Sequence, residues 1–154
     1  MIRITQSFLI RKIAEHLSEN EWIILYTDYP QGSRGGIGVK SLVHTIFETY
    51  YDRAPDILAY KNETLLLIEV NNKLEKKYID KFCEYDRHSS ALISELQEKL
   101  DLKIEDVKYG FGMKNQKIDM DVLKSLAISL IIFLLDSNYH VIEKTHQTNQ
   151  TFDK

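Results

Sequence analysis

Asp56 and Glu69 are the residues of this sequence whose types and spacing best suit chemistry. Asp56 opens the apolar segment 56–60 (DILAY), Glu69 nearly closes the segment 64–70 (TLLLIEV), and a short polar turn separates the two. This pattern is typical of a β-hairpin, and a two-residue turn at 62–63 would place the two acids opposite each other, with Cβ atoms ~5 Å apart. Like charges so placed repel, whereas Mg²⁺ is held by one or two carboxylates, so the pair indicates a metal site. The alternative is that each acid is an ordinary solvated charge at the end of its strand.

The residues around this pair resemble a known family motif. Pro55-Asp56, followed by Glu69-Val70-Asn71 on an apolar strand and then by a long helical segment, resembles the PD-(D/E)XK nuclease superfamily. The resemblance implies an α/β, restriction-endonuclease-like fold, a mixed β-sheet flanked by helices. It also implies hydrolysis of phosphodiester bonds with Mg²⁺ (or Mn²⁺), in which Asp56 and Glu69 bind the metal and Val70 lends its carbonyl.

The sequence departs from the superfamily pattern at Asn71, where the resemblance places a lysine that activates water. An asparagine cannot take a proton and therefore cannot be a general base. One alternative is that Lys73, on the face of Glu69 if the strand continues, reaches the water one pleat later. A second is that Asn71 only orients the water, and a third is that the site is inactive.

Further residues are implied around this centre. In the superfamily a helix often adds another carboxylate, and the candidates are Glu15 and Glu48; each is also typical of an ordinary polar helix face. The chain has no overall basic field, because its formal net charge is −3. Nucleic acid must therefore meet a local patch. The basic residues predicted to contact it are Arg34, Lys40, Lys77, Lys108 and Lys114.

Composition and length predict one ordinary globular domain. Of the 154 residues, 44% are hydrophobic and 28% charged, which excludes a disordered or collagen-like chain, and the single cysteine excludes an internal disulfide. The longest apolar stretch, residues 126–135, is too short to span a bilayer. We therefore expect a cytoplasmic protein without membrane contact, with one domain over residues 1–143 and a polar tail over 144–154.

The periodicity of apolar residues predicts the order helix, strand, helix, hairpin, long helix and two further strands, an α/β or α+β sandwich. Besides the hairpin, the expected elements are a helix at 5–18, a strand at 22–26, a glycine-rich loop at 29–40, a helix at 42–51, a helix at 74–100, a strand at 107–112, a short helix near Val122 and a strand at 126–135.

These observations predict a metal-dependent nuclease, a hydrolase acting on nucleic acid and most simply on DNA. A domain this small has little room for elaborate sequence reading, so a homodimer or a partner subunit is expected. The first alternative is a nuclease-fold protein without catalysis that serves as a nucleic-acid-binding or assembly subunit, which Asn71 favours. The second is an α/β domain that binds a small ligand or protein, with the two acids incidental.

Overall fold

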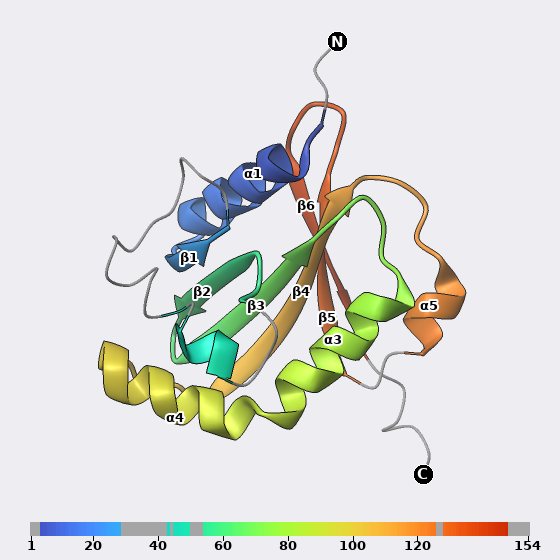
Figure 1. Cartoon of the computed structure of the whole chain (residues 1–154). Coiled ribbons are helices and arrows are strands. Elements are labelled where there is room, and N and C mark those ends of the chain that lie inside the picture. The colour runs from blue at the N-terminus through green and yellow to red at the C-terminus, as the bar shows by residue number, and fades with distance from the viewer. Residues whose placement is uncertain (1–3, 29–42, 44, 50–53, 126–127, 148–154) are drawn as a thin grey trace.

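The computed structural model describes residues 4–28, 43, 45–49, 54–125 and 128–147 as an α/β fold with a six-stranded mixed sheet between helices (Figure 1). The strands follow one another across the sheet in sequence order. They are β1 (Ile23–Thr27), β2 (Ile57–Lys61), β3 (Thr64–Val70), β4 (Asp106–Lys114), β5 (Leu130–Leu135) and β6 (Val141–His146). The helices are α1 (Gln6–Glu19), α3 (Lys76–Arg87), α4 (Ser89–Leu100) and α5 (Met120–Lys124), and residues 45–49 are also helical.

The central strands of the sheet are parallel and the outer ones antiparallel. β3, β4 and β5 run parallel, which requires crossover connections, and these carry α3 with α4 and then α5. β1, β2 and β6 pair antiparallel with their neighbours. The pairing of β1 with β2 contains a bulge between Ile24 and Tyr26. Because β3 and β4 are paired on both edges and covered on both faces, nearly all of β3 and the stretch of β4 from Tyr109 to Met113 are buried.

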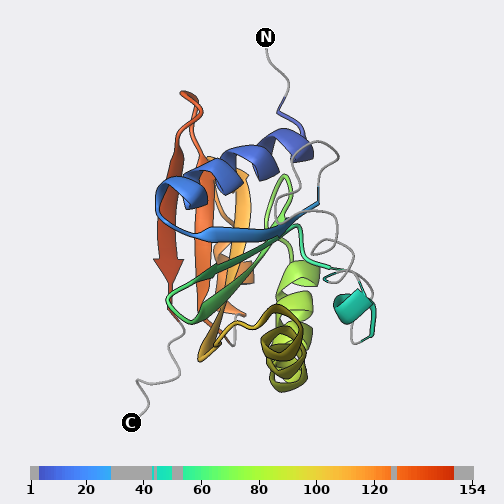
Figure 2. The same cartoon turned by 90° about the vertical axis from the view of Figure 1, so that its left-hand side faces the viewer.

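Alternating residues of the sheet feed two hydrophobic cores. Leu65 and Leu67 of β3 pack with α3 and α4, whereas Leu66, Ile68 and Val70 pack with α1. Figures 1 and 2 show α1 crossing the strands on one face, with α3 and α4 on the other. Because side chains alternate along a strand, Glu69, which lies between Ile68 and Val70, points towards α3.

The hairpin has the predicted register. Lys61 pairs with Thr64 and Ile57 with Ile68, which is the pairing of a two-residue turn. The turn residues Asn62 and Glu63 have φ of 48° and 65°, as the tight turn of a twisted hairpin requires. A three-residue turn would have shifted every pair and turned the acids to different faces.

The helix predicted over residues 74–100 is in fact two helices. α3 ends at Arg87, α4 begins at Ser89, and His88 between them has φ −108° and ψ 16°. No glycine or proline marks the break. The change of direction, visible in Figure 1, lets both helices lay their buried residues on the same hydrophobic core.

The sheet extends past the predicted domain boundary at residue 143. Residues 144–146, expected in the polar tail 144–154, belong to β6, and residues 148–154 lie outside the described part of the chain. β6 is mostly exposed and polar, so it lacks the apolar alternation by which a strand is recognised. The predicted glycine-rich loop 29–40 also lies outside the described residues. Within the described ranges, no helix is long and apolar enough to cross a bilayer.

The close contact between α1 and β4 depends on Gly112. A Cβ at this position would lie 2.2 Å from Ile13 Cδ1 and 3.3 Å from Val70 Cγ2. We expect Gly112→Ala to lower the free energy of unfolding by about 1–3 kcal/mol through overpacking. Ile13→Val removes the obstructing methyl group, so the double variant should lose about 1 kcal/mol less than the two single losses together, measured by urea unfolding. Strictly additive losses would contradict this packing.

Candidate active site

Asp56 and Glu69 are the only acidic or basic residues that the described part of the chain buries, with 4% and 1% of their surfaces exposed. Glu69 is the penultimate residue of β3, and Asp56 directly precedes β2 rather than belonging to it. Strand alternation directs Glu69 towards α3. The interpretation of both acids as solvated charges at strand ends is therefore wrong.

The Asp56 carboxylate is held by the main chain of β3 and by α1. Its Oδ2 accepts a hydrogen bond of 2.8 Å from the Val70 N–H and lies 3.5 Å from Gln6 Nε2. The same Gln6 nitrogen donates to the Val70 carbonyl at 2.9 Å. The side chain of Asp56 and the main chain of Val70, both predicted metal ligands, are thus held together by direct bonds.

Glu69 is held from the opposite face by two side chains of α3. Its Oε2 lies 3.0 Å from Lys81 Nζ and accepts a 2.7 Å hydrogen bond from the Tyr85 hydroxyl. Lys81 and Tyr85 are four residues apart and so share one face of the helix. The Lys81 side chain is 23% exposed, so its ammonium group stands between the buried acid and the solvent.

The pKa of Asp56 is raised from 3.8 to about 7. The main cause is burial, which disfavours the charged carboxylate, and the next is repulsion by the charge of Glu69. The Val70 N–H and the charge of Lys81 act in the opposite direction without cancelling these two effects. When Asp56 is ionised, the two buried carboxylates carry one more charge than Lys81 neutralises, an arrangement suited to binding a cation.

Neither Asn71 nor Lys73 stands free beside the carboxylates. Asn71 Nδ2 donates to the Tyr78 hydroxyl, and its Oδ1 accepts from the Asn72 N–H. Strand β3 ends at Val70, so the extended geometry on which the Lys73 alternative depends is absent. The Lys73 side chain is 70% exposed, with Nζ 3.9 Å from Glu75 Oε2.

The two additional carboxylates also lie apart from the pair. Glu15 is 45% exposed and forms an ion pair of 3.7 Å with Lys12. Glu48 is exposed on the helical residues 45–49. Among the residues that the structure describes, no third Asp, Glu, His or Cys completes a metal-binding group with Asp56 and Glu69.

The predicted basic residues divide between two ends of the sheet. Lys114 ends β4 two residues after Gly112, the partner of Val70, so it lies at the carboxylate end. Lys77, at the start of α3, lies 3.9 Å from Glu75. Lys108 is four residues before Gly112, ~13 Å away along the strand. Arg34 and Lys40 lie outside the described residues.

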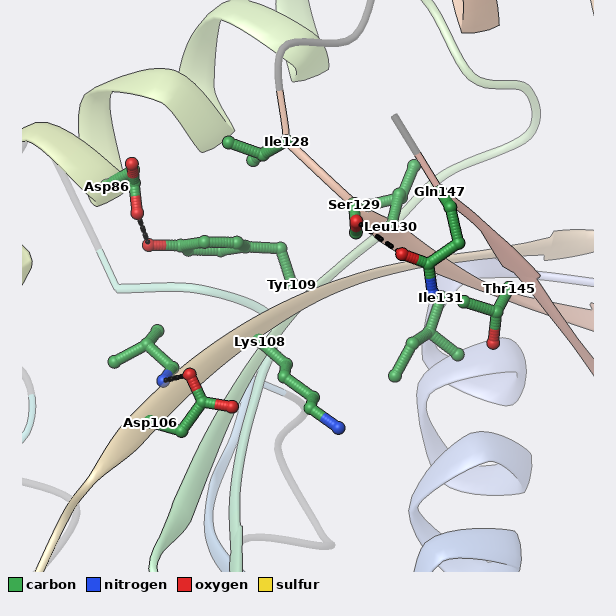
Figure 3. Close-up of a pocket in the computed structure, with 11 residues that line it drawn as sticks. Asp86, Asp106, Lys108, Tyr109, Ile128, Ser129, Leu130, Ile131, Thr145 and Gln147 are labelled. Carbon is green, nitrogen blue, oxygen red and sulfur yellow. Dashed lines mark hydrogen bonds between the residues drawn. The ribbon is translucent and has the colours of Figure 1, made fainter. Parts of the chain in front are cut away.

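Lys108 lines a separate polar cleft of about 660 Å³ between the first halves of β4 and β5 (Figure 3). Its acids already have partners, since Asp86 accepts from the Tyr109 hydroxyl and Asp106 from the Val107 N–H. Lys108 therefore belongs to this cleft rather than to the Asp56–Glu69 site.

Three residues that contact the carboxylates, Lys81, Tyr85 and Gln6, were not predicted from the sequence. Lys81 follows Glu69 by twelve positions rather than by two, and Gln6 lies fifty positions before Asp56. The only local signal for Lys81 is its i, i+4 spacing from Tyr85 on an amphipathic helix. Gln6 carries no signal, because its role depends on where the end of α1 lies in space.

The chain matches no protein-family model, no curated protein and no solved structure.

Proposed function

We propose that this protein is a Mg²⁺- or Mn²⁺-dependent nuclease with a restriction-endonuclease-like fold, and that DNA is its substrate. The observation that carries the proposal is the buried pair Asp56 and Glu69 beside the main chain of Val70, with the ammonium group of Lys81 3.0 Å from Glu69. Burying two acids side by side costs free energy unless their charges are compensated. A cation site gives a physical reason for that cost.

The residues of the pair fit a hard divalent cation. Carboxylate and carbonyl oxygens are the ligands that Mg²⁺ and Mn²⁺ prefer, and Asp56, Glu69 and the Val70 carbonyl supply both kinds. When bound there, such a cation supplies charge neutralisation at a phosphate and lowers the pKa of a coordinated water. Because the pKa of Asp56 is about 7, protons compete with the cation at acidic pH.

Lys81 supplies the positive charge that Asn71 cannot. Its Nζ is anchored by Glu69 and is partly open to solvent, so it can donate a hydrogen bond to a phosphate oxygen or to the attacking water. A fixed cation at that position stabilises the negative charge that develops on the phosphate in the transition state. Tyr85 holds the same Glu69 oxygen and thereby fixes where Lys81 is anchored.

The test is cleavage of supercoiled plasmid by the purified chain in millimolar Mg²⁺ or Mn²⁺, with EDTA as the metal-free control. We expect Lys81→Met to lower the initial rate by ~10² or more, the usual size of lost electrostatic or acid–base assistance. Lys73→Met is the matched control, because the side chain of this lysine is 70% exposed and pairs with the exposed Glu75; its rate should stay near that of the parent. Equal losses in both variants would contradict the role of Lys81.

The competing function is a nucleic-acid-binding or assembly subunit without catalysis. The observation that favours it is that the amide of Asn71 is hydrogen-bonded to the Tyr78 hydroxyl and to the Asn72 N–H, so it is not available to position a water. A parent protein that binds DNA with a steep salt dependence but leaves plasmid intact in both metals would support this alternative.

A further inference from the structure

The amide of Gln6 fills the space between two oxygens of the candidate metal site. Gln6 Nε2 lies 2.9 Å from the Val70 carbonyl oxygen and 3.5 Å from Asp56 Oδ2. Gln6 is the first residue of α1, on the face of the sheet opposite to Lys81 and Tyr85. The site is therefore closed by α3 over Glu69 and by α1 over Asp56 and Val70.

An amide nitrogen between two oxygen acceptors takes the place that a cation would take. The N–H groups of this nitrogen carry partial positive charge and interact with the lone pairs of the two acceptor oxygens. A cation bound between the two oxygens would attract the same lone pairs. A cation bound to both oxygens at about 2.1 Å leaves no room for that nitrogen. The other end of the amide is an oxygen, and rotation about the last side-chain bonds moves the nitrogen away and directs this oxygen at a cation bound between the two acceptors.

We infer that Gln6 is an additional, uncharged ligand of the divalent cation, which it binds through Oε1 after its amide turns away from the Asp56 and Val70 oxygens. This inference rests on the proposed function, since it requires a cation at Asp56 and Glu69. It adds an amide oxygen to the two carboxylates and the Val70 carbonyl, and it makes α1 part of the metal site.

The charges of the site explain why an amide suits this position. Two carboxylates and the ammonium of Lys81 leave one negative charge when all three are ionised, and a third carboxylate would add repulsion to a pair already buried together. In the described part of the chain, no third acid forms a metal-binding group with the pair. Gln6 itself is exposed, so its side chain is free of the dense packing that would prevent the turn.

The experiment measures cation binding directly, with Mn²⁺ by electron paramagnetic resonance and with Tb³⁺ by luminescence sensitised through Tyr85. We expect Gln6→Leu, similar in size but without polar atoms, to raise the dissociation constant for Mn²⁺ by ~10-fold. Gln6→Glu should tighten Tb³⁺ at least ~10-fold more than Mn²⁺, because the added charge favours the trivalent ion. The control is Gln116→Leu, another exposed glutamine that donates to a main-chain carbonyl, that of Asn72; its constants should equal those of the parent.

The outcomes separate this inference from the proposed function. Gln6→Leu that binds Mn²⁺ as tightly as the parent, or more tightly, overturns the inference and makes Gln6 only a competitor of the cation. Gln6→Glu without gain for Tb³⁺ overturns it as well. A parent that binds neither ion overturns both the inference and the metal-dependent function. Gln6-dependent binding without any plasmid cleavage supports the ligand and overturns the nuclease.

Discussion

Glu69→Gln is expected to reduce plasmid cleavage by at least ~10³, equivalent to about 4 kcal/mol in the barrier. The substitution keeps the shape of the side chain and leaves an oxygen to accept the hydrogen bond of Tyr85. It removes the charge that would hold the cation and that anchors Lys81 at 3.0 Å. The single substitution thus removes the negative charge of Glu69 and releases the positive charge of Lys81 from its anchored position. The measurement is the initial nicking rate in Mg²⁺, with folding checked by the unfolding temperature.

Glu75→Gln is the control for this prediction. Glu75 is 45% exposed and lies near two lysines at the start of α3, so it tests whether any loss of negative charge near that helix lowers the rate. Its rate should remain within about threefold of the parent, because exposed ion pairs contribute little. Activity retained in Glu69→Gln would show that the cleavage originates elsewhere.

Asp56→Asn is expected to stabilise the metal-free protein at alkaline pH. The folded-state pKa of Asp56 is raised to about 7 from 3.8, so its contribution to stability is fully present below pH 4 and is lost as the pH rises through 7. An asparagine does not ionise and does not suffer this loss. At pH 8 the variant should therefore gain about 3 kcal/mol relative to the parent, and the gain should vanish near pH 4.

The measurement is urea unfolding of both proteins in EDTA across that pH range. Asp80→Asn is the matched control, because Asp80 is 65% exposed in its ion pair with Lys76 and should change stability by less than about 0.5 kcal/mol at any pH. A difference between Asp56→Asn and the parent that does not depend on pH would show that Asp56 is already ionised in the folded metal-free protein. A large gain in the stability of Asp56→Asn at pH 8 would show that Asp56 lowers the stability of the parent protein, as residues retained for function often do.

The local parts of the site could be predicted from the sequence, because a hairpin is a local structure. A polar turn of fixed length between two apolar segments determines the pairing of Ile57 with Ile68, and hence brings Asp56 to the main chain of Val70. The predicted segment 64–70 coincides with β3, whereas the alternative in which the strand continues to Lys73 is wrong, because the chain leaves the sheet after Val70.

The contributions of distant segments could not be predicted in the same way. Lys81 and Gln6 reach the carboxylates only because α3 and α1 cross the sheet at particular places, and periodicity fixes which face of a helix is buried but not where it crosses. The break at His88 is likewise a result of packing, since it lets two apolar stripes share one core. β6 was not predicted, because an exposed strand at the edge of a sheet buries little of its surface and therefore lacks alternating apolar residues.

The exposed character of β6 also governs how copies of this protein behave when they are crowded together. Its outer side is one end of the described sheet, and a row of main-chain donors and acceptors at such an end is a template onto which another chain can add. Glu143 and Lys144 place opposite charges side by side in the middle of this strand. A second copy added parallel and in register would bring Glu143 beside Glu143 and Lys144 beside Lys144, and these like charges would repel. The strand that is hardest to recognise in the sequence therefore opposes fibre-like growth of the sheet and favours colloidal stability at high concentration.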